Sequence, residues 1–245
     1  MMQAMIFAAG LGTRLKPLTD SRPKALVEVK GQPLLWHVIM KLKDAGFTRL
    51  VVNVHHFASQ ITDYLRAQEN FGMDIRISDE SRQLLDTGGG IRAAAPLFAT
   101  DCPILIHNVD IFSNADLASF YRQAAEADAT LLVSRRATNR YLLFNSDRQL
   151  KGWTNVSTGE MRGPVAEGGA ERSSLCQYAF SGIHVFSPRL FPMMQSWGEC
   201  FGIIDFYLQA CATADIRGVV QEDLRLLDVG KTANLREAEN PEWHV

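Results

Sequence analysis

Short apolar runs alternate with segments of helical spacing along the first half of this chain, and this alternation constrains the fold more than any other feature. Residues 4–8, 50–54 and 104–109 are predominantly apolar runs of strand length. Residues 33–43 carry leucine, valine and isoleucine at helical spacing, and Gly46 ends that segment. Strands that alternate with helices form right-handed crossovers, which give a mostly parallel sheet covered on both faces.

The predicted fold is therefore α/β, with a mostly parallel, Rossmann-like doubly wound sheet in a single domain over residues 1–245. Residues 141–186 depart from the pattern, because short β-like runs are interrupted by glycine-rich stretches. We expect an antiparallel β flap or small subdomain there. The remaining C-terminal part is expected to hold two closing helices, near residue 188 and over 201–212, and a late strand over 225–229.

Composition limits the classes of partner. The chain is 47% hydrophobic with a net charge of −2, which argues against a general nucleic-acid surface. No apolar stretch is long enough to span or anchor in a membrane, and the four cysteines include no CxxC pair. We expect a cytoplasmic protein with reduced thiols. An anionic substrate would have to meet a local cluster of cations.

Such a cluster follows the first predicted strand. Gly10 and Gly12 allow backbone N–H groups to approach a ligand closely, and consecutive N–H groups of this kind form an anion-binding concavity. Arg14 and Lys16 add full positive charges. The purely structural alternative is that Gly10 and Gly12 form a tight turn without a ligand. The functional interpretation is a phosphate-binding loop at the carboxyl end of a strand, where open α/β sheets bind ligands.

Two better-known phosphate loops are excluded. A dinucleotide fingerprint would need a third glycine at the position of Leu15. A Walker loop ending at Gly230-Lys231-Thr232 would need a glycine at the position of Arg225.

Six sequence blocks are distinctive, and in chain order they are residues 10–19, 22–27, 86–90, 108–110, 180–183 and 227–230. Together they resemble the signature of the sugar-1-phosphate nucleotidyltransferases, and the resemblance covers residues 4 to about 236. The short chain and the Thr-Gly-Gly-Gly block within residues 86–90 are most similar to uridylyltransferases acting on N-acetylmuramate 1-phosphate. Guanylyltransferases acting on mannose 1-phosphate or heptose 1-phosphate are similar too.

The resemblance implies that a nucleoside triphosphate (NTP) and a sugar 1-phosphate react to give a nucleotide sugar and pyrophosphate. The attacking phosphate has a second pKa near ~6 and is already ionised at neutral pH, so no general base is required. We find no convincing Ser-His-Asp or Cys-His arrangement. Positioning and charge neutralisation should therefore carry catalysis.

The resemblance also assigns roles to residues. Arg14, Lys24 and Asp110 are expected to be catalytic, and Asp110 and Asp228 to bind Mg²⁺, since Mg²⁺ takes one or two carboxylates together with substrate phosphates and water. For Asp205 an ordinary polar helix position is an equal alternative. The expected nucleotide-binding residues are Ala9, Gly10, Gly12, Thr13, Arg14, Lys24, Gly88 and Gly89, and the expected sugar-binding residues are Asn155, Gly182 and Asp205.

Two departures from the family pattern concern the metal loop and the acceptor. Val109 stands where the family commonly has glycine, so the loop before Asp110 has less freedom. Many members also carry a flap lysine that contacts the sugar phosphate. This chain has no equivalent lysine, and neither Lys151 nor Arg162 aligns convincingly as a replacement.

Two alternatives stay open at this point. One is a cytidylyltransferase acting on a phosphorylated alcohol, and the other is a non-catalytic sensor of nucleotides or nucleotide sugars on the same fold. The sequence leaves the nucleobase, the sugar and the oligomeric state undetermined.

Overall fold

The computed structural model describes residues 1–124, 126–168, 174–241 and 243. Within these residues, no helix combines the length and the apolar character needed to cross a bilayer.

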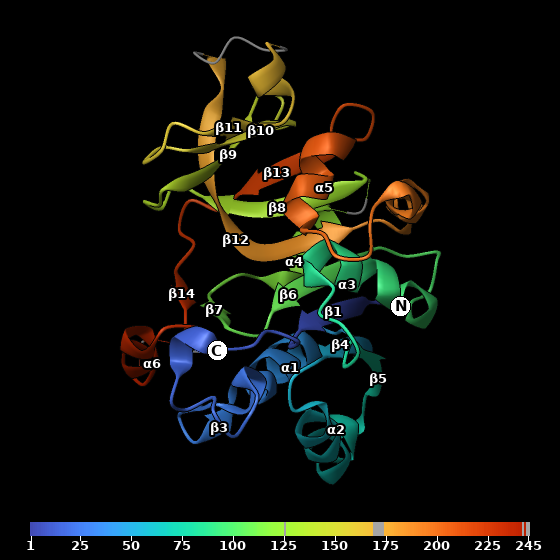
Figure 1. Ribbon diagram of the computed structural model, residues 1–245, viewed down its shortest axis with the longest axis vertical. Coiled ribbons are helices and arrows are strands. Elements are labelled where there is room, and N and C mark those ends of the chain that lie inside the picture. Colours follow the sequence, from blue (N-terminus) through green and yellow to red (C-terminus); the bar gives the residue numbers. More distant parts are fainter. Residues whose placement is uncertain (125, 169–173, 242, 244–245) are drawn as a thin grey trace.

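Four parallel strands form the centre of the fold (Figure 1). Their register aligns Phe7 with Asn53 on one side and with Asn108 on the other, so the strands end at nearly the same level. The carboxyl ends of the strands therefore form one edge. In spatial order the strands are β6 (Ile104–Asn108), β1 (Gln3–Phe7), β4 (Arg49–Val54) and β5 (Asp74–Asp79).

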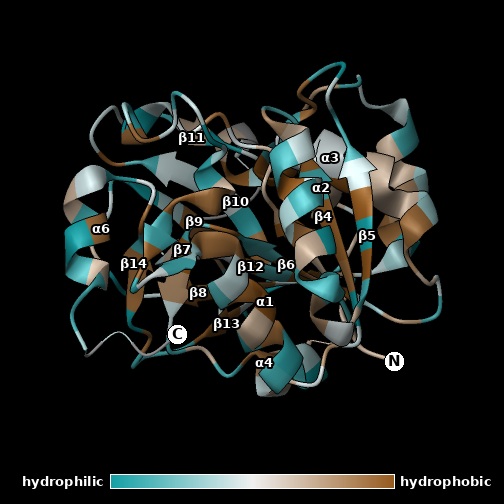
Figure 2. Ribbon diagram, turned by 90° about the horizontal axis from the view of Figure 1, so that it is seen from below, coloured by the Kyte–Doolittle hydropathy of each residue, from teal (hydrophilic) through white to brown (hydrophobic). Residues whose placement is uncertain are grey.

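Helices cover both faces of this sheet, as the alternation predicts. Ala4 and Ile6 of β1 pack into one core cluster with α1 (Leu34–Asp44), α2 (Ala58–Ala67) and α4 (Leu117–Gln123). Met5 points the other way, into a second cluster with α3 (Asp86–Ala94) and α5 (Ile203–Ala210). Figure 2 shows the apolar strands inside and hydrophilic stretches on the outer surfaces of the helices.

A second group of strands extends the same sheet and is mainly antiparallel. We call β1, β4, β5 and β6 with α1–α4 the parallel half, and the second group with α5 the antiparallel half, which lies above the parallel strands in Figure 1. The strands of the antiparallel half are β8 (Ala129–Ser134), β9 (Arg140–Phe144), β10 (Leu150–Asn155), β11 (Met161–Arg162), β12 (Cys176–Phe186) and β13 (Ile216–Val220).

Strand β12 joins the two halves. Its C-terminal part pairs with β6, and its N-terminal part pairs with β9. A bulge between Phe180 and His184 separates these parts, and Gly182 within it has a φ of 80°. Residues other than glycine rarely adopt that φ. A Cβ at this position would also lie 2.8 Å from Asn108 Nδ2, so the bend requires glycine.

Shorter elements complete the chain. Two small two-stranded sheets pair β2 (Glu28–Val29) with β3 (Gln32–Pro33), and β7 (Ile111–Ser113) with β14 (Leu226–Asp228). The remaining helices are α6 (Thr232–Ala238) and 3₁₀ segments at Thr13–Leu15, Lys24–Leu26, Glu69–Gly72, Ala95–Leu97, Pro164–Glu167 and Pro188–Ser196.

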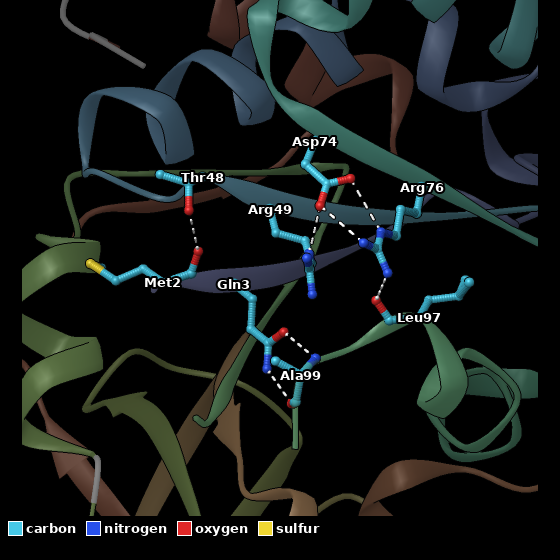
Figure 3. Close-up of polar contacts among 8 residues, drawn as sticks. All are labelled: Met2, Gln3, Thr48, Arg49, Asp74, Arg76, Leu97 and Ala99. Carbon is cyan, nitrogen blue, oxygen red and sulfur yellow. Dashed lines mark hydrogen bonds and ion pairs between the residues drawn. The ribbon is translucent and has the colours of Figure 1, made fainter. Parts of the chain in front are cut away.

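Structural polar contacts tie together the amino end of the parallel strands (Figure 3). Arg49 Nε lies 2.7 Å from Asp74 Oδ2, and Arg76 Nε lies 3.2 Å from Asp74 Oδ1. The hydrogen bond from Arg76 is the main reason that the pKa of Asp74 lies below its usual value. Gln3 Nε2 donates to Ala99 O at 2.8 Å. These side chains bond to one another or to backbone groups, and they hold together the amino end of the sheet.

Candidate active site

The loop after β1 is held by side chains from other segments. Ala8 N and Ala9 N donate to Asn53 Oδ1 at 2.7 and 3.3 Å. Gly12 has a φ of 65°, and Thr19 Oγ1 donates to its carbonyl oxygen at 2.9 Å. A Cβ at Gly12 would lie 2.8 Å from Thr19 Cγ2. Both the backbone conformation and the space therefore require glycine there.

Asn53 is in turn fixed by a buried carboxyl group. Asn53 Nδ2 donates to Glu80 Oε1 at 2.7 Å, and Leu85 N donates to Glu80 Oε2 at 3.2 Å. Burial raises the pKa of Glu80, although these two hydrogen bonds act in the opposite direction. A Cβ at Gly90 would lie 2.8 Å from Glu80 Oε1, so α3 presses closely on the pair. The network connects β4, β5 and α3 to the phosphate loop.

Three charged side chains from distant parts of the chain meet beside Gly230. Lys24 Nζ bonds to Asp110 Oδ2, and both side chains are nearly buried. Gly230 N donates to Asp228 Oδ1 at 2.9 Å. A Cβ on Gly230 would lie 2.6 Å from Asp110 Oδ2 and 2.8 Å from Asp228 Oδ1. It would also lie 2.8 Å from Lys24 Nζ. The two aspartates therefore converge, as the sequence predicts.

The charge at Asp228 is stabilised by its surroundings. Burial raises the pKa of its carboxyl group, but the Gly230 N–H and the positive charges of Arg14 and Lys24 outweigh that effect. The pKa consequently lies below its usual value. Arg14 is half exposed, and its guanidinium lies 3.4 Å from Asp228 Oδ2. Asp228 is thus ionised at neutral pH and available as an oxygen ligand.

A cavity of about 400 Å³ opens beside these groups, at the carboxyl edge of the parallel strands. Gly10 is exposed at its mouth, and a Cβ there would meet nothing within 4 Å, so the loop backbone is accessible. Of the predicted nucleotide-binding and catalytic residues, Ala9, Gly10, Lys24 and Asp110 line the cavity, whereas Gly12, Thr13 and Arg14 belong to the turn beside it. The other lining residues are Phe7, Ala8, Asn53, Glu80, Leu84, Asp86, Thr87, Asn108, Val109 and Cys200.

Gly88 and Gly89, which the resemblance assigns to nucleotide binding, lie in the first turn of α3. Their N–H groups donate to Phe201 O at 2.8 and 3.2 Å. A Cβ at Gly88 would lie 2.4 Å from the Phe201 ring, and one at Gly89 would lie 2.3 Å from Glu199 O. Both glycines allow α3 to pack closely against the segment that carries Glu199 and Phe201, and their part in nucleotide binding stays a prediction.

The predicted sugar-binding residues fall into two groups. Gly182 lines a cavity of about 370 Å³ that also includes Asn108 and Asp228, next to the converging aspartates. Asp205 lines another cavity, of about 350 Å³, in the antiparallel half. Asn155 lines neither cavity, and its Oδ1 accepts hydrogen bonds from Ser157 N and Oγ at 3.1 and 2.7 Å. That turn accounts for the Asn155 side chain without a sugar.

Several residues at the site escape sequence reasoning. Asn53 is a polar residue inside an apolar run, and Glu80 directly follows β5, so each carries a weak signal that the alternation obscures. Arg136, Arg140 and Lys231 line the cavities beside Gly182 and Asp205, and nothing in their local sequence distinguishes them from solvated surface cations.

An open α/β sheet whose carboxyl edge gathers a glycine loop, a nearly buried lysine and two carboxylates defines a class of nucleotide-handling enzymes. Comparison with known proteins narrows the class. Residues 3–142 match the family model for nucleotidyl transferases, and the chain belongs to that family.

Two relatives of the chain have the same name as each other. The chain is 31% identical over 239 residues to the N-acetylmuramate alpha-1-phosphate uridylyltransferase of Neisseria meningitidis serogroup B, covering 97% of each chain. It is 50% identical over 109 residues to the enzyme of that name from Caulobacter vibrioides, although this stretch spans only 44% of the chain and 45% of that relative.

The fold recurs in solved structures. HddC from Yersinia pseudotuberculosis, complexed with GMP-PN, superposes with a TM-score of 0.75 at 20% identity, covering 98% of each chain. The likeness supports the α/β architecture predicted from the sequence.

Proposed function

We propose that this protein transfers uridine monophosphate from UTP to N-acetylmuramate 1-phosphate, giving a nucleotide sugar and pyrophosphate. The observation that carries the proposal is the meeting of Lys24, Asp110 and Asp228 around Gly230 beside the phosphate loop. The choice of UTP and of this acceptor follows the two relatives that share that activity in their names.

The residues present fit a Mg²⁺ ion. Two carboxylates face the small space beside Gly230, which a single added Cβ would fill. Within the described residues no group of three or more His, Cys, Asp or Glu gathers, so water and substrate phosphates would have to complete the coordination. That composition is typical of Mg²⁺ and unlike the all-protein cages of structural zinc. Asp110 and Asp228 would hold the ion, which when bound neutralises phosphate charge.

The chain's own groups account for the remaining requirements. The loop backbone at Ala9 and Gly10 faces the cavity and would cradle the triphosphate. An oxygen of the sugar phosphate attacks the α-phosphorus, the new P–O bond forms, and the bond to the β-phosphate oxygen breaks to release pyrophosphate. Lys24 is positioned to stabilise charge that develops at the α-phosphate, because its Nζ lies where Asp110 and the cavity meet.

A matrix of substrates tests the proposal. Pyrophosphate release is measured for the four NTPs, each with N-acetylmuramate 1-phosphate, N-acetylglucosamine 1-phosphate, mannose 1-phosphate or phosphocholine, with Mg²⁺ or with excess EDTA. We expect the largest kcat/KM for UTP with N-acetylmuramate 1-phosphate, and no turnover in EDTA.

The same matrix separates the alternatives. Turnover only with CTP and phosphocholine would replace the proposal with the phosphorylated-alcohol cytidylyltransferase. Nucleotide binding detected by calorimetry, without pyrophosphate release from any pair, would indicate the sensor.

A further inference from the structure

Two cavities continue from the converging aspartates into the antiparallel half. The near cavity is lined by Asp228, Lys231 and Arg136, together with the bend of β12. The far cavity lies along the loop between β8 and β9, opposite α5. Arg136 and Phe180 line both cavities, so the two adjoin at these residues. An acceptor whose phosphate lies beside Asp228 would extend its sugar toward the far cavity.

The far cavity has an excess of positive charge. Three arginines line it, at positions 136, 140 and 162, against a single carboxylate, Asp205. Arg162 is already occupied, because its NH1 lies 2.5 Å from Asp205 Oδ1 and its guanidinium stacks 3.9 Å from the Trp153 ring centre. Asp205, the one carboxylate that lines the cavity, is therefore already paired with Arg162.

The other two arginines have no carboxylate partner within the part of the chain that the structure describes. Arg136 donates only to a backbone oxygen, Phe180 O at 2.9 Å. Arg140 makes no ion pair there, although its side chain borders the cavity. The neighbouring Arg135 differs, because it pairs with Glu222 at 3.0 Å and lines neither cavity. Two guanidinium groups without a carboxylate partner among the described residues thus face one cavity, while the neighbouring Arg135, which has such a partner, lies outside it.

We propose that Arg136 and Arg140 bind a second anionic group of the acceptor, a carboxylate carried by the sugar away from its 1-phosphate. A guanidinium fork matches a carboxylate in shape and charge, and a neutral sugar would leave both forks unpaired. The inference rests on the proposed function. It adds the residues that distinguish an acidic sugar from a neutral one, and N-acetylmuramate 1-phosphate carries such a carboxylate on its lactyl ether whereas N-acetylglucosamine 1-phosphate does not.

Arg140 gives the cleaner test, because Arg136 also borders the near cavity where the phosphate would lie. The acidic and neutral acceptors are compared with UTP for the wild-type enzyme, Arg140→Gln, Arg140→Lys and the control Arg135→Gln. A charge-assisted hydrogen bond contributes enough to change affinity by about tenfold or more. We expect Arg140→Gln to lower kcat/KM for the acidic acceptor by about tenfold and to leave the neutral acceptor nearly unchanged.

The controls sharpen this expectation. Arg140→Lys should restore part of the loss, since the charge remains but the fork is gone. Arg135→Gln should behave as wild type with both acceptors. Because Arg136 and Arg140 are exposed, the preference of the wild-type enzyme for the acidic acceptor should also weaken as ionic strength rises. Calorimetry with UDP-N-acetylmuramate and UDP-N-acetylglucosamine should show the same selective loss in binding.

Each contrary result overturns the inference. Equal losses for both acceptors would assign Arg140 to the part of the substrate that they share. No loss for either would remove it from the site. If the wild-type enzyme transfers UMP to both acceptors without preference, the inference is wrong but the proposed function is not affected. Failure to transfer to any sugar phosphate would sink both.

Discussion

The parallel and antiparallel halves differ in how their polar side chains are held. In the parallel half Asn53, Glu80 and Asp110 are buried and bonded to side-chain or backbone groups of the chain itself. In the antiparallel half Arg136 and Arg140 are exposed, and the described chain supplies them no carboxylate. The side chains of the parallel half are therefore already held in place, whereas the two arginines of the antiparallel half would gain a charged partner only from a ligand.

That contrast has a consequence for mutagenesis. Changes in the parallel half should affect the chemical step or the stability of the fold, because its side chains position one another. Changes in the antiparallel half should affect only the acceptor.

Asp110→Asn should lower kcat by about 1,000-fold or more, since it removes one of two carboxylates available to the metal. Asparagine has nearly the same shape, so the fold should persist, but the melting temperature should fall because the nearly buried Lys24 loses its ionised partner. Pyrophosphate release and thermal unfolding are the measurements, with Asp63→Asn as control, an exposed aspartate paired with Arg66 on α2. Near wild-type turnover would remove Asp110 from the metal site.

Lys24→Ala should lower kcat by about 100-fold while raising the Kd for UTP by much less, because the lysine is expected to act on charge that develops in the transition state. The control is Lys43→Ala, an exposed lysine of α1 whose Nζ donates to Phe71 O at 2.7 Å. Single-turnover kinetics and calorimetry separate the two quantities. Equal effects on both would mean that Lys24 binds ground state and transition state alike.

Gly230→Ala tests the convergence directly. The added methyl group would lie within 2.8 Å of Lys24 Nζ and of Asp228 Oδ1, so the charged groups must move apart. We expect kcat/KM to fall by about tenfold or more with the fold intact, because small displacements at a reacting centre are costly. Gly198→Ala is the control, since a Cβ there meets nothing within 4 Å. Unchanged activity would show that the space beside Gly230 is not used.

Asn53→Ala should destabilise the protein by about 2–3 kcal/mol, because it leaves the buried Ala8 and Ala9 amides without this acceptor and removes one of the two hydrogen bonds to the Glu80 carboxyl group. The Kd for UTP should rise several-fold as the loop loosens, and the KM of the acceptor should stay the same. Chemical denaturation measures the first effect. Asn114→Ala is the control, because Asn114 also bonds backbone groups but is exposed. Equal destabilisation by both changes would show that the buried hydrogen bonds of Asn53 contribute no more to stability than those of an exposed asparagine.

How far the sequence predicts the fold depends on the same division. The apolar runs at residues 4–8 and 50–54 match β1 and β4 to within about one residue, because buried strands and their hydrophobic patterns are local. The glycine block at 88–90 lies within α3 although glycine disfavours helix interiors, because its three members pack against Phe201, Glu199 and Glu80, contacts that no local pattern predicts. Strand β13 and helix α6 were not predicted.

The candidate site divides in the same way. The convergence of Asp110 and Asp228 was expected because both follow apolar runs in blocks with a known order. The partners Asn53 and Glu80, and the free arginines of the far cavity, depend on contacts between distant segments. A single sequence records the residues but not which of them meet.

Asp205→Asn should have the smallest effect and would sharpen the comparison most. Its ion pair with Arg162 is roughly half exposed, so stability should change by less than about 1 kcal/mol. If Asp205 also bonds a sugar hydroxyl, the KM of the acceptor should rise about threefold, as for the loss of one ordinary hydrogen bond, while the Kd for UTP stays constant. Asp215→Asn, which breaks a comparable pair with Arg217, should alter neither. A change in UTP binding as large as the change in acceptor KM would show that the two halves do not act separately.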